Sequence, residues 1–464
     1  MRLARRHGMS QTCALVVGLL ILAACTSSTA SSPTPSPSLA PTSAPAQVTA
    51  ASPAPAGSSS PESSMPPTSP AASAASPAAS PSPSPATAVR REGSYEGGTY
   101  RYVVPPNWNG GLVMYAHGIQ QGFGPSVQEP PLSSHIVSKG YAWAASSYRA
   151  NNYAPHLGME DTLALKRLFV REVGQPRWTI LYGQSMGGQI VTGSLETRPD
   201  EYQAGLAECG LVDGVWEIEF LLSYTAVAEL ISGVPLLDAP DRVTFGRLIG
   251  EQWVPMMGTP GAYTARGALF DSVVKYLMGG DLPYRIDGLQ GRYLMNLNRY
   301  QEPSSSQDVA LRHADTRALV FQVDPGLGMT AEELNAKVRR FAPAPGARDP
   351  ARDPAFAERT GSLKGPLLTL HTTGDGWVPF SHVQRYGRRT IAAGTEHLLV
   401  QRAIRRPRHC DFNAQERTLA FDDLVTWLET GARPDGDDVL ASDLSQIGTR
   451  WTTPLYVDDP ARKR

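Results

Sequence analysis

Residues 178–190 read WTILYGQSMGGQI and combine an apolar run, a glycine-rich turn and the start of a helical pattern. The apolar run at 178–182 has the composition of a buried strand, and residues 186–197 are predicted to form a helix. The turn between them, Gly183-Gln184-Ser185-Met186-Gly187, is a weak signal by itself because glycine and serine are common. At a sharp junction between a strand and a helix, however, such a turn holds its central serine strained and accessible. The stretch therefore predicts that Ser185 is a nucleophile carried by a sheet.

Short apolar runs alternate with helical patterns on both sides of this stretch. Strands are predicted at residues 111–116, 141–146, 178–182, 204–208, 366–370 and 396–401, and helices at 160–173, 186–197 and 413–431. Strands that alternate with helices form parallel sheets with right-handed crossovers. We therefore expect an α/β fold with a mostly parallel, doubly wound sheet.

The alternation stops at residue 213 and resumes at 363, and the residues between are predicted to be mainly helical. Residues 215–231 carry a broad apolar face, and Thr330-Ala331-Glu332-Glu333 is a capping box. We expect this insertion to cap the carboxyl edge of the sheet, where open α/β folds bind ligands. Its large apolar residues are explained better as the core of the cap than as a substrate pocket: Trp216, Phe220, Tyr224, Trp253, Met256, Met257, Tyr263 and Phe270.

The N-terminal region has the features of an export signal followed by a tether. Basic residues precede a short apolar run, and Leu22-Ala23-Ala24-Cys25 resembles a bacterial lipobox, which implies lipidation of the Cys25 thiol after cleavage. Ordinary cleavage without lipidation is the alternative. The Ser/Pro/Ala-rich residues that follow hold too little apolar surface to fold. The formal net charge is −1, so the chain lacks the surplus of basic residues that is typical of nucleic-acid-binding proteins.

These composition changes divide the chain into segments. They are a signal peptide at 1–24, a lipidated cysteine and tether at 25–90, the two parts of the sheet domain at 91–212 and 363–432, the cap at 213–362, and a C-terminal extension at 433–464.

The chain from about Gly111 to Gly431, apart from the insertion, resembles the α/β-hydrolase superfamily. The similarity is greatest to its secreted bacterial esterases and prolyl-oligopeptidase-like members. Three motifs carry it: the Gly-x-Ser-x-Gly junction, the loop Gly374-Asp375-Gly376-Trp377-Val378-Pro379, and His117-Gly118 after the strand at 111–116. The loop His-Gly-Ile-Gln lacks the His-Gly-Gly-Gly run of many lipases. In the strand numbering of this fold, the helical cap is inserted between the sixth and seventh strands, and it resembles no lid that would indicate a substrate.

The resemblance implies a triad in the chain order serine, acid, histidine. Asp375 follows a predicted strand on a glycine-flanked turn and is the expected acid, with Asp213 as the alternative. His409 lies between the last strand and the last helix and is the expected base. Two other histidines fit less well, because His397 lies inside a predicted strand and His382 follows Asp375 too closely.

The resemblance also implies an oxyanion hole made of two backbone N–H groups. One is expected from Met186, the residue after the nucleophile, and the other from Ile119, with Gln120 as the next choice.

Two cysteines, Cys209 and Cys410, remain in the exported chain after Cys13 leaves with the signal and Cys25 becomes the anchor. Both are expected at the carboxyl edge of the sheet, and we predict that they form a disulfide that fixes the His409 loop. Two buried free thiols are the alternative. The sequence shows no zinc-ligand spacing and no phosphate-binding loop, so no metal and no cofactor are expected.

The sequence therefore predicts an exported, membrane-anchored serine hydrolase that cleaves carboxylic esters of small molecules or polymers through an acyl-enzyme. A peptidase or an envelope acyltransferase with the same triad is the nearest alternative. An alternative of another class is a non-catalytic binding lipoprotein on the same scaffold. The oligomeric state is not indicated.

Overall fold

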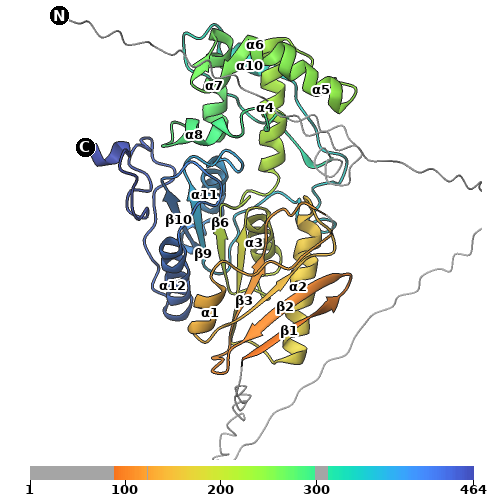
Figure 1. Ribbon diagram of the computed structural model, residues 1–464, viewed down its shortest axis with the longest axis vertical. Helices are drawn as coiled ribbons and strands as arrows, with labels where there is room; N and C mark the ends of the chain where they lie inside the picture. Colours follow the sequence, from red (N-terminus) through yellow and green to blue (C-terminus); the bar gives the residue numbers. More distant parts are fainter. Residues whose placement is uncertain (1–87, 123, 298–311, 464) are drawn as a thin grey trace, which may run out of the picture. The chain divides into compact units, whose positions relative to one another are not determined.

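In the computed structural model, which describes residues 88–122, 124–297 and 312–463, eight strands form one sheet in the order β1-β2-β4-β3-β5-β6-β9-β10 (Figure 1). The strands are β1 (Val89–Tyr95), β2 (Gly98–Val104), β3 (Gly111–Ala116), β4 (Ala142–Ser146), β5 (Trp178–Gln184), β6 (Ala204–Glu208), β9 (Leu367–Thr372) and β10 (Leu399–Ile404). β1 and β2 pair antiparallel, as do β2 and β4, and every other neighbouring pair is parallel. The signal sequence, Cys25 and the tether lie outside the described residues.

Helices cover both faces of this sheet. Along β3, Leu112 and Met114 belong to one buried cluster and Val113 and Tyr115 to another, which follows from the two-residue period of a strand. The first cluster includes residues of α2 (Pro155–Glu172), α3 (Met186–Thr197) and α11 (Ser381–Ala393), and the second includes residues of α1 (Ser133–Ser138) and α12 (Ala414–Thr430). This strand order, with a large insertion between the sixth and seventh strands of the sheet, is the α/β-hydrolase fold, as predicted.

The structure differs from the sequence analysis at three places. The β1–β2 hairpin was not expected, although its turn at Glu96-Gly97 has the positive φ angles that glycine favours. α2 begins at Pro155 rather than residue 160, since proline suits the first turn of a helix. Residues 396–398 form a short 3₁₀ helix, η2 (Glu396–Leu398), and the strand starts only at Leu399.

The insertion between β6 and β9 forms a cap with a hydrophobic core of its own. Its elements are α4 (Trp216–Ser232), α5 (Arg242–Leu248), the π-helical turn η1 (Ile249–Trp253), α6 (Val254–Met257), the hairpin β7 (Gly258–Thr259) and β8 (Ala262–Tyr263), α7 (Ala265–Met278), α8 (Arg285–Gln290) and α10 (Ala331–Lys337). The core includes Trp216, Phe220, Tyr224, Trp253, Met257 and Phe270, so these residues are structural as expected. Tyr263 packs against it partly buried, and Met256 is exposed.

The expectation of a mainly helical insertion was wrong for its last part. Residues 314–366 contain one helix, α10, which begins with the predicted capping box at Thr330 and Glu333, and are otherwise irregular. Prolines at 343, 345, 350 and 354 explain why no helix continues there, because each lacks an N–H donor and clashes with a preceding turn.

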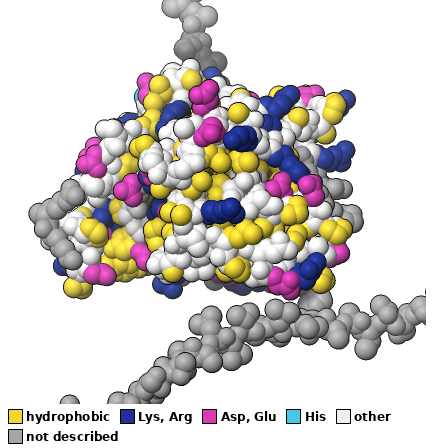
Figure 2. Space-filling model, turned by 90° about the horizontal axis from the view of Figure 1, so that it is seen from above, with side chains coloured by type: hydrophobic (Ala, Val, Ile, Leu, Met, Phe, Trp, Pro, Cys, Tyr) yellow, Lys and Arg dark blue, Asp and Glu magenta, His cyan; other side chains and the backbone are white. Residues whose placement is uncertain are grey.

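The C-terminal segment returns to the sheet domain. A fully buried ion pair joins Arg405, just after β10, to Asp459, with Nη2 and Oδ1 2.7 Å apart, close to η3 (Pro460–Lys463). Seen from above in Figure 2, basic and acidic side chains are intermixed over the visible face. None of the helices in the described ranges combines the length and apolar character that crossing a membrane requires.

Candidate active site

Ser185 occupies a strained turn between β5 and α3. Its φ of 54° and ψ of −121° are unusual for a residue other than glycine. The turn depends on the glycines beside it: a Cβ at Gly187 would lie 2.0 Å from the carbonyl oxygen of Ala116, and one at Gly183 would lie 2.2 Å from that of Gly187. The predicted strand–turn–helix junction is therefore present, with backbone packed too closely for any larger residue.

Backbone hydrogen bonds fix the serine against the neighbouring strand. The Ser185 N–H donates to the Glu208 carbonyl at 3.0 Å, and the Ser185 carbonyl accepts from Gly188 at 2.8 Å and Leu211 at 3.1 Å. The buried carboxylate of Glu208, to which the sequence analysis gave no role, accepts from Tyr182 at 2.7 Å and from other neighbours. A glutamate at the end of an apolar strand was the signal that could have indicated this support.

Asp375 and His409 form a buried acid–histidine pair. His409 Nδ1 and Asp375 Oδ2 are 2.6 Å apart, and Asp375 Oδ1 accepts from the backbone N–H groups of Trp377 at 2.9 Å and Val378 at 3.0 Å. Burial by itself would raise the pKa of Asp375, but the charge and hydrogen bond of His409 and the Val378 N–H hold it below its ordinary value. Asp375 is thus a carboxylate that orients His409 and leaves Nε2 as the nitrogen available for chemistry.

The other acid and base candidates have different partners. Asp213 is buried and bound by two arginines, with Arg385 Nε at 2.6 Å from its Oδ2 and Arg389 bound to its Oδ1. His382 is fully buried and contacts Glu217, with Nε2 3.2 Å from Oε2. His397 lies on the exposed turn η2. Within the described ranges, none of these three residues forms a hydrogen bond with Asp375 or His409.

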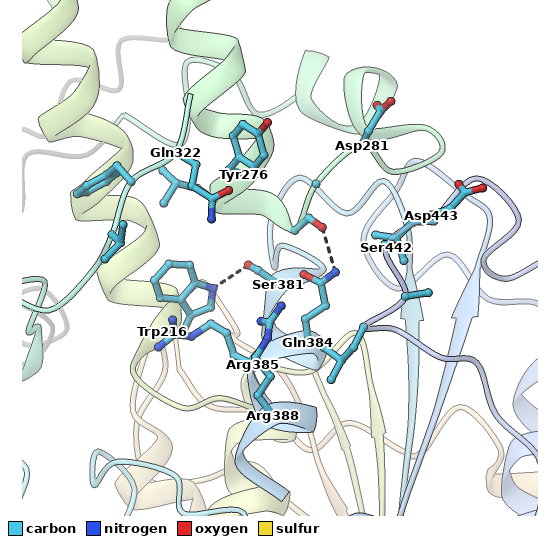
Figure 3. Close-up of a pocket in the computed structure, with 18 of the residues that line it drawn as sticks. Trp216, Tyr276, Asp281, Gln322, Ser381, Gln384, Arg385, Arg388, Ser442 and Asp443 are labelled. Carbon is cyan, nitrogen blue, oxygen red and sulfur yellow. Dashed lines mark hydrogen bonds between the residues drawn. The ribbon is translucent and has the colours of Figure 1, made fainter. Parts of the chain in front are cut away.

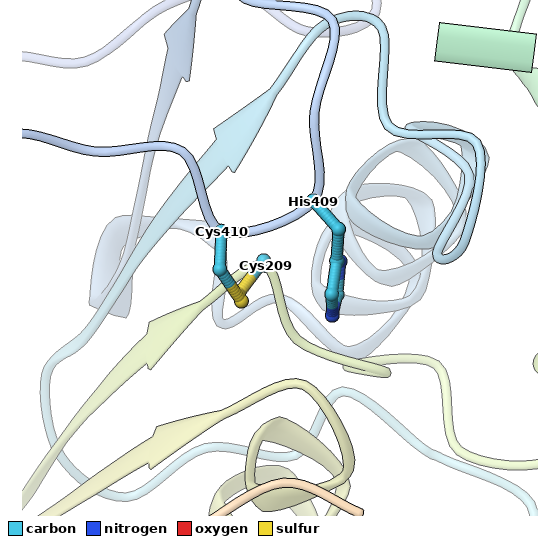
Figure 4. Close-up of side chains that lie close together, drawn as sticks. All are labelled: Cys209, His409 and Cys410. Carbon is cyan, nitrogen blue, oxygen red and sulfur yellow. A yellow bond between two sulfur atoms is a disulfide. The ribbon is translucent and has the colours of Figure 1, made fainter. Parts of the chain in front are cut away.

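A disulfide between Cys209 and Cys410 ties the His409 loop to the end of β6, and the two Cα atoms are 5.2 Å apart (Figure 4). Cys209 follows Glu208, whose carbonyl binds Ser185, so one covalent link connects the supports of the serine and the histidine. The two sulfurs and His409 lie within 4.8 Å of one another, but both sulfurs are consumed by the bridge and supply no thiolate for a metal.

The Ser185 hydroxyl makes no hydrogen bond with His409 in the described part of the chain. Catalytic hydrogen bonds are often long before substrate binds. The loop after β3 runs directly beside the serine, because a Cβ at Gly118 would lie 2.9 Å from Ser185 Cβ and 3.5 Å from its Oγ. The structure thus gathers Ser185, Gly118 and the disulfide-linked His409 loop at the carboxyl ends of β3, β5, β6 and β10.

The two predicted oxyanion donors belong to the helix that follows the serine and to the loop whose Gly118 approaches it. Met186 is the first residue of α3, where N–H groups have no acceptor within the helix. The Ile119 N–H makes no hydrogen bond to any described residue. The loop that carries it is fixed by His117, whose ring stacks on Tyr148 at 3.9 Å and whose Nδ1 lies 2.7 Å from the Gly118 carbonyl oxygen.

The cap packs directly on the acid loop, and the sequence analysis missed the residues that do so. A Cβ at Gly288 of α8 would lie 1.5 Å from the carbonyl oxygen of Gly374, and Asn296 Nδ2 donates to the Gly376 carbonyl at 3.1 Å. Arg292 covers the ring of Trp377, which stacks on His409 with centroids 5.9 Å apart. Of these residues, only Trp377 could have been singled out from the sequence, because it is a large aromatic residue within the acid motif.

A groove of about 830 Å³ lies along the seam between the cap and α11 (Figure 3). Trp216 Nε1 donates to Ser381 Oγ at 2.8 Å, and Gln384 Nε2 donates to the Gly279 carbonyl at 3.0 Å, so its walls join the two parts of the molecule. Neither Ser185, Asp375 nor His409 lines it. The chemistry therefore does not belong to this groove, despite its size.

Comparisons with known proteins give limited similarity. No family model matches the chain. The o-phthalyl amidase of Xanthobacter agilis is 30% identical over 107 residues, a match that covers 21% of this chain and 24% of the amidase. The acylaminoacyl peptidase of Pyrococcus horikoshii is 13% identical with a TM-score of 0.39, over 76% of this chain and 44% of the peptidase. Feruloyl esterase B from Aspergillus oryzae is 14% identical with a TM-score of 0.41, over 75% and 81%. The fold assignment therefore rests on the strand order and the junction at Ser185.

Proposed function

We propose that this protein is a serine hydrolase that cleaves carboxylic esters through an acyl-enzyme, with Ser185, His409 and Asp375 as its triad. The observation that carries the proposal is the 2.6 Å contact between Asp375 and His409 on a loop that a disulfide ties beside Ser185. A buried carboxylate on one nitrogen of a histidine, with a strained serine nearby, is the arrangement that acyl transfer requires.

In the proposed reaction, Ser185 Oγ attacks the ester carbonyl while His409 Nε2 takes its proton. Asp375 holds the imidazole by Nδ1 and stabilises its positive charge. The tetrahedral intermediate collapses when His409 returns the proton to the leaving alkoxide. Water then attacks the acyl-enzyme with His409 again as the base, which releases the acid and restores Ser185.

The negative charge of the intermediate is held by the backbone N–H groups of Met186 and Ile119. Each such donor typically contributes about 2.7–4 kcal/mol to the stabilisation of the transition state. The close approach of Gly118 to Ser185 supports this role, because it places the loop that carries Ile119 beside the reacting oxygen.

The test is covalent labelling by a fluorophosphonate together with hydrolysis of 4-nitrophenyl butyrate. We expect labelling and turnover in the wild type and neither in Ser185→Ala. Ser194→Ala is the matched control, because Ser194 lies on the same helix and its buried hydroxyl has no hydrogen-bond partner in the structure. Turnover that survives in Ser185→Ala would refute the proposal, and a wild type that binds esters without labelling would favour a non-catalytic binding protein.

Amide hydrolysis is the second candidate, favoured by the 30% identity to an o-phthalyl amidase over part of the chain. A 4-nitrophenyl ester and a 4-nitroanilide with the same acyl group would separate the two activities. A kcat/KM for the anilide close to that for the ester would assign the protein to the amidases.

We further propose that the protein is exported and lipid-anchored through Cys25 to a membrane on the outer side of the cytoplasm. The proposal is supported by the lipobox-like Leu22-Ala23-Ala24-Cys25 after a short apolar run. Metabolic labelling with an alkynyl fatty acid in a bacterial host tests it. Cys25→Ala should abolish the label, whereas Cys13→Ala should leave it unchanged.

A further inference from the structure

Arg292 is a partly buried cation beside the proposed base, and among the described residues no acidic group forms an ion pair with it. It extends from the segment after α8, and its guanidinium carbon lies 3.4 Å from the centroid of the Trp377 ring. The same ring stacks on His409 with an interplanar angle of 15°. Trp377 is 46% exposed, so solvent reaches this pair of side chains beside the proposed base.

The hydrogen-bonding capacity of Arg292 is almost unused. Its Nη1 contacts the sulfur of Met295 at 3.3 Å, and its Nε is buried without a partner. None of the ion pairs in the described part of the chain includes Arg292. A guanidinium has five donors in a planar fork that matches a carboxylate, and leaving such donors unsatisfied when buried is costly.

The backbone around Arg292 is held firmly against the acid loop. Gly288 contacts the loop at Gly374, Asn296 donates to the Gly376 carbonyl at 3.1 Å, and a Cβ at Gly376 would lie 3.1 Å from Arg292 Cγ. A charged side chain that is fixed in this way has lost much of its conformational entropy before any ligand arrives. Arg292 is therefore held in a position that suits the binding of an anion.

Two carboxyl groups, Glu217 and Asp375, act on Arg292 at longer range. Asp375 is occupied by His409, and Glu217 accepts from His382 Nε2 at 3.2 Å. Burial, together with the charge of Asp375, raises the pKa of Glu217 well above its ordinary value. Glu217 is consequently a poor counter-ion, and the positive charge of Arg292 remains to be matched.

We propose that Arg292, stacked on Trp377, forms a subsite for a carboxylate on the substrate, so that the enzyme selects anionic esters or amides derived from dicarboxylic acids. The inference rests on the proposed function and names the substrate class of the same site. The carboxylate binds the free edge of the guanidinium, and a chain or ring links it to the scissile carbonyl at Ser185. Ser185 then attacks the second, neutral acyl group of the same substrate.

The experiment compares two esters that differ only in this charge: 4-nitrophenyl hydrogen adipate and its neutral carboxamide analogue. The wild type should prefer the anionic ester in kcat/KM. Arg292→Gln should lower that preference by about tenfold to a hundredfold, the range for a hydrogen-bonded charge pair, mainly through KM. Arg292→Lys should retain part of it, because a lysine keeps the charge but loses the fork.

Arg388→Gln is the matched control, since Arg388 is exposed in a groove that neither Arg292 nor the triad lines, and removing it changes the net charge equally. It should leave the preference unchanged. Equal rates of the wild type on the two esters, or equal loss on both in Arg292→Gln, would overturn the carboxylate subsite while fluorophosphonate labelling of Ser185 still upheld the hydrolase. Absence of labelling and of turnover in every form would instead refute the proposed function.

Discussion

The loops of the sheet domain and the cap segment that carries Arg292 meet at the proposed active site. The two regions fix their residues there by different kinds of contact. Ser185 and Asp375 are fixed largely by backbone: the N–H and carbonyl groups of neighbouring strand ends and glycines without room for a Cβ. Arg292 and Trp377 are fixed by contacts between side chains and by the cap resting on the acid loop. In the proposed enzyme, the sheet domain supplies the chemistry and Arg292 of the cap supplies the selectivity.

The largest expected effect concerns the acid of the sheet domain. Asp375→Asn should lower kcat/KM by about 10⁴-fold, because the histidine loses the carboxylate that orients and stabilises it. Asp213→Asn should lower the melting temperature by breaking its contacts with Arg385 and Arg389, but keep most of the activity of the folded enzyme. Ester kinetics and thermal unfolding of both variants check this, and an equal loss of activity would place Asp213 in the chemistry.

Removal of the disulfide tests whether the His409 loop needs a covalent support. Removing both cysteines in Cys209→Ala/Cys410→Ala should lower the free energy of unfolding by about 2–5 kcal/mol, since the bridge restricts the unfolded chain. Urea unfolding measures this, with the reduced wild type as the control. Unchanged stability and unchanged ester turnover would show that the hydrogen bond to Asp375 suffices.

The contact between cap and acid loop can be broken at a single glycine. Gly288→Ala would place a Cβ 1.5 Å from the Gly374 carbonyl oxygen, so the cap or the loop must move. We expect kcat/KM to fall by about tenfold to a hundredfold, as for small displacements of catalytic groups. Gly291→Ala is the control, because nothing lies within 4 Å of a Cβ there. Full activity in Gly288→Ala would show that the sheet domain works independently of the cap.

The smallest effect concerns the pH dependence of stability at the seam. Burial raises the pKa of Glu217 above its ordinary value of 4.5, so the folded state holds a proton that the unfolded state releases. The free energy of unfolding should therefore fall as the pH rises from about 4.5 through the raised pKa. Glu217→Gln should flatten this slope in urea titrations at several pH values, whereas the exposed Glu251→Gln should not. An unchanged slope would mean that Glu217 is solvated and ionised in the native state.

The sequence predicted the strands and helices of the sheet domain well where the residues that decide an element lie close together in the chain. β3 and α3 have the predicted bounds, and α12 begins with the predicted capping box at Asn413 and ends before Gly431. It failed where the deciding interaction is distant. The β1–β2 hairpin, the 3₁₀ turn at 396–398 and the irregular segment 338–366 depend on pairing and packing partners that no short window contains.

The sequence alone determined the strand–turn–helix junction at Ser185, the order in which Asp375 and His409 follow, and the two cysteines available for a bridge, because each depends on residue type and position along the chain. Only the tertiary structure decided that Asp213 and His382 have other partners, and that Glu208 supports the serine from the next strand. It also decided that Arg292, nearly 120 residues before His409, contacts the same tryptophan as that histidine. Such contacts arise from the packing of a cap on a sheet edge, which brings together residues whose separation along the chain carries no local signal.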